Sequence, residues 1–392
     1  MRRFSTLVVA LLLGAGALFV VVRHAPALLT PAQAQAPLPI DNSGAQRLAF
    51  QVVPDFLKYP ATMNLGEVLG VAVNSKGEIA VLSHPGSATT GPIYGAATTQ
   101  IFIFDRNGRF VKEIGQGVYG LAYAHAVRYD RYDNLWVVDK ATNSVMKFNP
   151  AGYVTMNLGR RPEGYETFAP HYERAEPQAA TPVEGYFNGP TDIGWDAQDN
   201  IYISEGYVNN RIVKYDKNGD WVKAWGRFGE GGASGNENPG NFRNAHGMAM
   251  DRQGNVYAAD RGNRRIQVFN SDGQFLRFLY LNAPYDKMHR FVLGNTPANR
   301  PDATQPWALC ITPNGPTQYL FAADQEPGRL YKMTLDGRIL GYWGQSGREA
   351  DELNWPHAIA CPTENEVYIA DMNNWRVTKL VMNNARATAP SR

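Results

Sequence analysis

Three of the seven histidines in this chain stand at the same place in a repeated pattern. His125, His246 and His357 each open a strand-like stretch, and the same number of positions separates each of them from a later aspartate. Three imidazoles with one open position are typical of catalytic zinc sites, although imidazole also suits other transition metals. The pattern predicts a metal site, with zinc as the expected ion, if the fold brings the three residues together.

The elements that must position these histidines are six copies of one unit. Each copy reads as strands with alternating apolar positions, separated by turns such as Asn218-Gly219 and Asp272-Gly273. A single four-stranded sheet cannot bury both faces, so such units pack around an axis as blades. We therefore expect an all-β, six-bladed β-propeller over residues 46–382.

The residue that opens the innermost strand is a histidine in every second copy of the unit. Alternate blades of a six-fold ring lie about a third of a turn apart, so three histidines in alternate copies are expected to converge on the axis. A single histidine at a strand start is more often a hydrogen-bonded core residue, but the shared register favours metal binding. In chain order the six residues are Leu69, His125, Thr191, His246, Trp307 and His357.

The residues that follow the second strand of each copy are expected to share a face with the histidines, because antiparallel strands reverse direction. Long loops between blades open on this face too, and we expect a small-molecule or peptide substrate to bind there. The loop residues His171, His289, Tyr165 and Tyr172 are interpreted as solvent-facing. The strand-end residues are Lys140, Gly206-Tyr207, Arg261, Gln325-Glu326 and Met372, and the loops span 160–186, 229–241 and 282–304.

Other repeated features are given structural roles. The carboxylates Asp139, Asp260, Asp324 and Asp371 are expected to cap turns through backbone N–H groups. The last copy lacks a fourth strand, and residues 48–53 are expected to supply it and close the ring. The two cysteines, Cys310 and Cys361, are interpreted as small buried apolar residues, with a disulfide, which an exported location would permit, as the alternative.

The N-terminus reads as a targeting segment. Arg2 and Arg3 precede an apolar run at 7–22, and Ala-x-Ala sites lie at 32–34 and 34–36. These features predict a signal peptide over residues 1–36, with a membrane anchor through residues 7–22 as the alternative. The protein is expected to be exported to the periplasm or the cell exterior, with a polar tail at 383–392. A net charge of +2 argues against nucleic-acid binding, and we expect a monomer.

Over residues 66–381 the chain resembles NHL-repeat propellers and, among them, peptidyl-α-hydroxyglycine α-amidating lyase (peptidylamidoglycolate lyase). The resemblance implies that His125, His246 and His357 hold zinc, that Tyr207 acts on the substrate hydroxyl and that Arg261 belongs to the active site. It implies cleavage of the C–N bond of a carbinolamide to an amide and glyoxylate. The likeness is densest at residues 190–193, 205–213, 259–267, 324–327 and 355–359.

Two departures from the family pattern leave other functions open. The family has an active-site arginine after the second strand of its first blade, where this chain has Pro85. The family also has an aspartate that serves a calcium ion, where this chain has Ala358. The alternatives to the lyase are a non-catalytic NHL propeller that binds a peptide, carbohydrate or protein partner, and another hydrolase or lyase that uses the same metal site.

Overall fold

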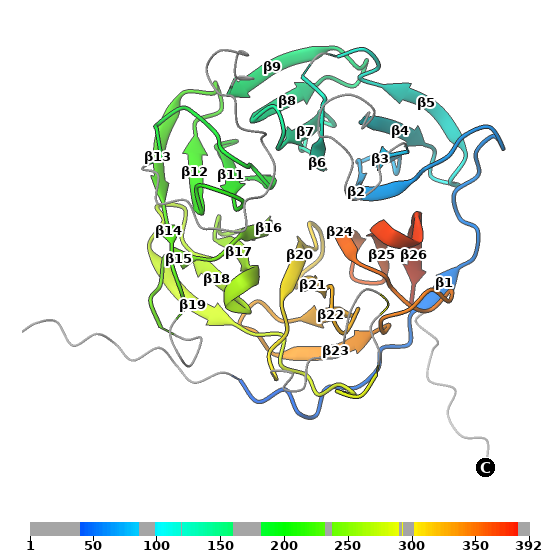
Figure 1. Ribbon diagram of the computed structural model, residues 1–392, viewed down its shortest axis with the longest axis vertical. Coiled ribbons are helices and arrows are strands. Elements are labelled where there is room, and N and C mark those ends of the chain that lie inside the picture. The colour runs from blue at the N-terminus through cyan, green and yellow to red at the C-terminus, as the bar shows by residue number, and fades with distance from the viewer. Residues whose placement is uncertain are drawn as a thin grey trace, which may run out of the picture. The chain divides into compact units, whose positions relative to one another are not determined.

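The computed structural model describes residues 40–85, 99–118, 120–159, 182–231, 237–289, 292 and 302–382. These residues form six four-stranded antiparallel sheets, which Figure 1 shows as blades around a central axis. The only helical elements of the described part are two single-turn 3₁₀ helices, η1 (Arg261–Asn263) and η2 (Met372–Asn374). The prediction of an all-β, six-bladed propeller is confirmed.

The first five blades take their strands in chain order from the axis outward. Blade 1 contains β2 (Glu67–Val73), β3 (Ile79–His84), β4 (Gln100–Phe104) and β5 (Phe110–Ile114); blade 2 contains β6 (Ala124–Tyr129), β7 (Leu135–Asp139), β8 (Ser144–Phe148) and β9 (Val154–Gly159); blade 3 contains β10 (Asp192–Trp195), β11 (Ile201–Glu205), β12 (Arg211–Tyr215) and β13 (Trp221–Trp225). Blade 4 contains β16 (Ala245–Met250), β17 (Val256–Asp260), β18 (Arg265–Phe269) and β19 (Phe275–Leu279), and blade 5 contains β20 (Pro306–Ile311), β21 (Leu320–Asp324), β22 (Leu330–Met333) and β23 (Ile339–Trp343). A short parallel pair, β14 (Arg227–Phe228) and β15 (Asn241–Phe242), precedes blade 4.

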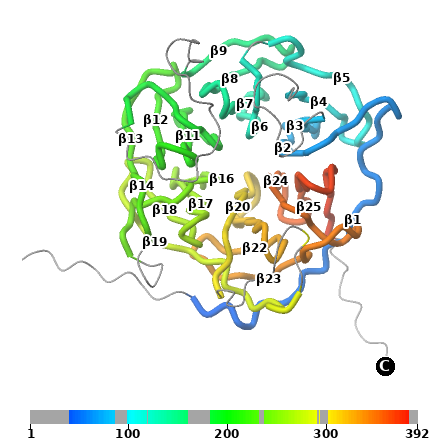
Figure 2. The backbone as a smooth tube through the Cα atoms, viewed as in Figure 1, coloured from blue at the N-terminus to red at the C-terminus, as the bar shows by residue number. Residues whose placement is uncertain are grey.

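Blade 6 joins the two ends of the propeller. It has the order β1-β26-β25-β24, from β1 (Gln51–Val53), β24 (Pro356–Thr363), β25 (Glu366–Asp371) and β26 (Arg376–Val381). Val52 lies opposite Leu380 in this pairing, and Figure 2 shows the blue N-terminal segment beside the orange-red blade. The predicted ring closure is confirmed, but the strand is shorter than expected because Leu48 donates its N–H to Tyr342 O of blade 5.

Two predicted segments lie outside the described residues: the signal or anchor segment 1–36 and the tail 383–392. Within the described part, no helix has the length and apolar character needed to cross a bilayer.

The apolar core lies between neighbouring blades. The second strands β7 and β17 are buried along their whole length, whereas the outer strand β9 has its first two residues exposed. One cluster joins Val268 of blade 4 to Tyr331 of blade 5, and another joins Leu82 of blade 1 to Val137 of blade 2. Each blade therefore buries both faces only because the ring places another blade on each side.

The repeated carboxylates fasten the loops at the mouth of the propeller. Asp139 accepts hydrogen bonds from the backbone N–H groups of Ala122 and Tyr123 before β6, and from those of Ala141 and Thr142 after β7. One buried carboxylate thus ties the entry of the innermost strand to the hairpin after the second strand. Equivalent bonds join Asp260 to Arg243 N and Asp371 to Asn354 N.

Cys310 and Cys361 form a disulfide, so the expectation of two reduced residues is wrong. Cys310 lies on β20 and Cys361 on β24, which are the innermost strands of neighbouring blades. The two Cα atoms are 6.0 Å apart, within the range that a disulfide needs. The pairing depends on how blades 5 and 6 lie beside each other. It cannot be deduced from the sequence, where the two cysteines are 51 positions apart.

Arg128 on β6 reaches across the axis and contacts four other blades. Its guanidinium forms a two-pronged pair with Asp192 of blade 3, with N–O distances of 3.0 and 2.6 Å. It also donates to the carbonyl oxygens of Met248 in blade 4, Leu309 in blade 5 and Ile359 in blade 6, at 3.3, 3.0 and 3.2 Å. Burial lowers the pKa of Arg128, but the attraction of Asp192 outweighs it and leaves this pKa above its ordinary value. One charged side chain therefore joins the innermost strands of five blades.

We predict that Arg128→Met lowers the free energy of unfolding by about 3–5 kcal/mol, because it leaves the buried Asp192 carboxylate without its partner. Arg131→Met is the matched control, since Arg131 is exposed and pairs with Asp199 at the surface. Denaturant unfolding of both variants checks the prediction. Equal losses in the two variants would contradict a central role for Arg128.

Candidate metal centre

β-Bulges at the start of the innermost strands aim the three histidines. The pairing of β6 with β7 shifts register between Ala124 and Ala126, so His125 occupies the extra position. His246 and His357 lie within equivalent shifts on β16 and β24. A bulge bends its strand and redirects the side chain at the irregular position. The same register shift occurs around Leu69 in blade 1 and Trp307 in blade 5. The bulge therefore belongs to the repeat, and it is the histidine at this position that recurs in alternate blades.

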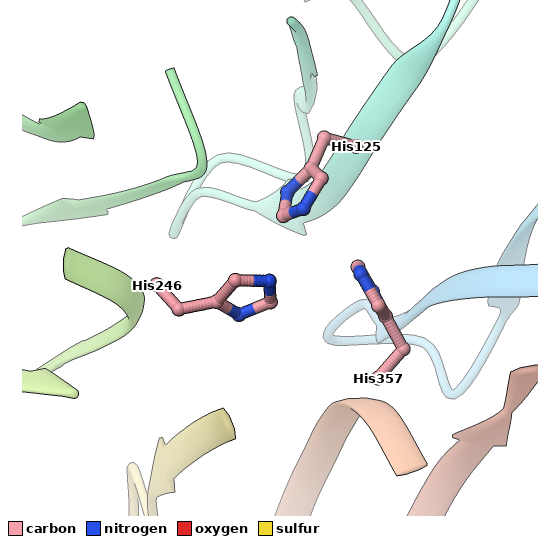
Figure 3. A group of neighbouring side chains, drawn as sticks. All are labelled: His125, His246 and His357. Carbon is pink, nitrogen blue, oxygen red and sulfur yellow. The ribbon is translucent and has the colours of Figure 1, made fainter. Parts of the chain in front are cut away.

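The three imidazoles converge at the axis, as Figure 3 shows. One ring nitrogen of each lies within 4.8 Å of the ring nitrogens of the other two. The ring centroids are 4.7 to 5.1 Å apart, and all three side chains are buried. Within the described residues, this is the group of histidine, cysteine and acidic residues whose geometry suits a metal ion.

Each imidazole is held by a hydrogen bond to the next blade. In every case Nδ1 lies beside the backbone carbonyl of the residue at the same register position in that blade. A carbonyl oxygen only accepts, so Nδ1 carries the proton and Nε2 keeps its lone pair for a ligand. The three bonds join His125 to Thr191 O at 2.7 Å, His246 to Trp307 O at 2.9 Å and His357 to Leu69 O at 2.8 Å.

Burial keeps the histidines neutral. It is the largest cause that lowers the pKa of His125 and of His246 well below the ordinary value, and it lowers the pKa of His357 to about 3. Lys140 lowers the pKa of His125 and His357 further, and Arg261 lowers the pKa of all three. Neutral imidazole is the form that binds metals, so at neutral pH this cluster is ready for a metal ion.

The residues present fit zinc. They offer three neutral nitrogen donors that are oriented by backbone carbonyls and lie close to a common centre. Three protein ligands leave a fourth tetrahedral position for a substrate atom. Both cysteines are engaged in the disulfide, so they offer no thiolate that would favour a softer ion.

The residues at the centre do not fit the calcium ion that the resemblance implies. Ca²⁺ takes six to eight oxygen ligands, but Ala358 stands in place of the family aspartate. The carbonyl groups of Met248, Leu309 and Ile359 that face the axis already accept hydrogen bonds from Arg128. A guanidinium supplies the positive charge at the centre of this propeller.

Tyr207 reaches the histidine cluster from blade 3. Its hydroxyl lies 2.8 Å from Nε2 of His125 and 3.4 Å from Nε2 of His246. The turn after β11 can pass this close to blade 4 because residue 206 is glycine: a Cβ there would collide with the backbone carbonyl of Ala245. The structure therefore brings Tyr207 together with the histidines, at the atoms where a metal would bind.

Arg261 reaches the same face from blade 4. It begins η1 directly after the buried Asp260, and its guanidinium carbon lies 4.0 Å from the ring centroid of Trp307. The same atom is 5.9 Å from the ring centroid of Tyr207. Stacking on Trp307 holds the planar guanidinium in place and leaves its edge N–H groups able to bind an anion.

The site contains residues that the sequence analysis does not select. His84, at the end of β3, is fully buried, and its ring lies 4.2 Å from the ring of Tyr123. Burial, with a smaller contribution from Lys140, lowers the pKa of His84 to about 3. The strand-end argument, applied to blade 1, would have found His84. Trp307 packs 4.9 Å from the ring of His246, and Trp355 packs 5.2 Å from Trp307.

The predicted loop residues contribute little that the structure describes. His171, Tyr165 and Tyr172 lie outside the described residues. His289 uses Nε2 to bond the carbonyl of Ser346 at 2.8 Å, rather than joining the three central histidines. The strand-end residue Met372 packs into the core that blades 1 and 2 share.

Known proteins share the repeat, the fold and parts of the sequence. The model of the NHL repeat matches residues 242–269. Peptidyl-glycine alpha-amidating monooxygenase A of Xenopus laevis is 26% identical over 79% of this chain and 31% of its own length. Peptidyl-alpha-hydroxyglycine alpha-amidating lyase 1 of Drosophila melanogaster is 26% identical over 66% of this chain and 44% of its own length. This chain thus spans less than half the length of these two relatives.

Among solved structures, virginiamycin B lyase from Staphylococcus aureus superposes with a TM-score of 0.50, covering 86% of each chain at 14% identity. That identity supports the fold alone. The strand order and this superposition show a six-bladed β-propeller, and the family model shows that it contains an NHL repeat. In sequence, the chain resembles peptidyl-α-hydroxyglycine α-amidating lyase.

Proposed function

We propose that this protein is an exported, zinc-dependent lyase that cleaves the C–N bond of an α-hydroxyglycine carbinolamide. The observation that carries the proposal is the position of the Tyr207 hydroxyl, 2.8 Å from Nε2 of His125 inside the buried histidine cluster. A metal site with an adjacent acid–base group suits the removal of a proton from a substrate hydroxyl. The relative from Drosophila melanogaster, which is named an amidating lyase, supports the same reaction.

The proposed reaction breaks the bond between the amide nitrogen and the carbon that bears the hydroxyl. The hydroxyl loses its proton and its oxygen becomes the aldehyde oxygen of glyoxylate. The nitrogen leaves with the electron pair of the broken bond and takes up a proton, which gives the amide. No water is consumed, so the reaction is an elimination and not a hydrolysis.

Residues of this chain supply the proton transfer and the orientation. Zinc bound by His125, His246 and His357 would act as a Lewis acid and lower the pKa of the substrate hydroxyl. Tyr207, as the phenolate, accepts the hydroxyl proton and returns a proton to the leaving nitrogen. Arg261 pairs with the substrate carboxylate and holds the reacting carbon beside Tyr207.

The second candidate is a non-catalytic propeller that binds a peptide, carbohydrate or protein partner at the same face. Pro85 favours it, because the resemblance implies a catalytic arginine at that place. The two candidates differ in whether metal-loaded protein releases glyoxylate from an N-acyl-α-hydroxyglycine.

We predict that the chain from about residue 36 onward purifies with about one zinc ion per molecule and that His246→Ala loses it, because two imidazoles rarely hold zinc. His289→Ala serves as the control, since His289 bonds the backbone of Ser346 away from the cluster. Elemental mass spectrometry measures the metal content. Metal-free wild-type protein, prepared without chelators and with zinc supplied, would overturn the zinc assignment.

We predict that Tyr207→Phe lowers kcat for glyoxylate release by about 10²- to 10⁴-fold, the usual contribution of a positioned acid–base group. Its zinc content should equal that of the wild type, because in this proposal the three histidines supply the metal ligands. Tyr153→Phe, at an exposed turn of blade 2, should leave kcat unchanged. An unaltered kcat in the Tyr207 variant would remove this residue from the mechanism.

A further inference from the structure

Two cations approach the ring of Tyr207 from the blades on either side of it. Lys140 of blade 2 places Nζ 4.2 Å from the centroid of this ring. Arg261 of blade 4 places its guanidinium carbon 5.9 Å from the same centroid. Tyr207 itself belongs to blade 3, so three consecutive blades contribute to one cluster beside the histidines.

The backbone at these positions is anchored in the same way. Lys140 donates its N–H to Tyr123 O, at 3.2 Å, and Arg261 donates its N–H to Asn244 O, at 3.1 Å. Tyr123 and Asn244 each stand two positions before a histidine of the cluster. The two cationic side chains therefore begin at equivalent, hydrogen-bonded points around the mouth of the site.

The acidic residues that directly precede the two cations in the chain are engaged in the scaffold. Asp139 precedes Lys140, and its carboxylate accepts hydrogen bonds from the backbone N–H groups of the adjoining loops. Asp260 precedes Arg261 and pairs with Arg265, at 2.9 Å, where both side chains are fully buried. Lys140 lies against the rings of Tyr123 and Tyr207, and Arg261 lies against those of Trp307 and Tyr207. Two positive charges on one face of the site attract an anionic ligand.

Lys140 also lies on the side of the site that borders blade 1. Its Nζ is 4.9 Å from the ring centroid of Tyr123, and that ring packs against His84 at the end of β3. Pro85 follows His84 and carries no charge. On this side of the histidines, among the described residues, the cation comes from blade 2.

We propose that Lys140 and Arg261 together bind the carboxylate of the substrate, and that Lys140 makes the site specific for carbinolamides with a free carboxylate. Arg261 offers a planar fork that matches the two carboxylate oxygens, while Lys140 adds a point charge from the blade on the other side of Tyr207. The proposal rests on the proposed lyase function for its substrate class. Lys140 acts here as a binding residue and takes no part in the proton transfer.

The test compares Lys140→Met and Lys140→Arg in the zinc-loaded protein. We expect Lys140→Met to raise KM for an N-acyl-α-hydroxyglycine about 10- to 100-fold, as expected for loss of a charged hydrogen bond, with kcat nearly unchanged. Lys140→Arg should restore most of the affinity. Lys147→Met is the control, because Lys147 lies on β8 of the same blade, over the ring of Trp136. An unchanged KM, or a shifted pH profile of kcat at constant KM, would overturn the proposal and assign Lys140 to tuning Tyr207.

A binding measurement separates this proposal from the lyase function. N-benzoylglycine lacks the hydroxyl and cannot react, and its methyl ester lacks the charge. Calorimetry should show that wild-type protein prefers the acid over the ester, and that Lys140→Met loses most of this preference. If the wild type binds the acid more tightly than the ester but releases no glyoxylate from hydroxyglycine substrates, the carboxylate site is supported and the lyase function is refuted. Equal binding of acid and ester by the wild type would refute the carboxylate site.

Discussion

Hydrogen bonds between neighbouring blades determine the geometry at the centre of this propeller. Each of the three histidines uses Nδ1 to bond a backbone carbonyl of the next blade, at the register position that the histidine occupies in its own. The bond sets the tautomer, the ring orientation and the direction of Nε2 together. It also requires the ring to be closed, because His357 of the last blade bonds Leu69 of the first. The geometry of the histidine cluster and the closure of the ring are therefore linked in one set of contacts.

A second constraint acts along the same axis. The innermost strands of a propeller leave backbone carbonyls facing the centre, and these groups need a donor or a cation. Arg128 supplies both, and its charge is balanced by Asp192. The central channel is thus occupied by protein at Arg128, while the three histidines keep their inward nitrogens for a ligand. The proposed chemistry therefore belongs to the face where Lys140 and Arg261 approach the ring of Tyr207.

Most of the fold and part of the site could be predicted from the sequence, because both depend on a repeated unit. The blades repeat, so a residue type that recurs in one register is visible without coordinates, as with His125, His246 and His357. The closing strand before blade 1 was also recognisable, because the last copy lacked one. Residues whose role occurs in one blade alone could not be recognised in this way. Nothing near Arg128 in the sequence distinguishes it from the exposed Arg131, and its partners belong to four other blades.

The sequence alone determined the all-β class, the number of blades and the alternation of the histidines, because these depend on local periodicity and repeat register. The folded chain was needed to find that Cys310 and Cys361 are bonded, that His84 lies buried beside Tyr123, and that Lys140 and Arg261 both approach the ring of Tyr207. These contacts join different blades, and their distances depend on the tilt and stagger of neighbouring sheets. That geometry results from packing all six blades at once, which no single stretch of sequence encodes.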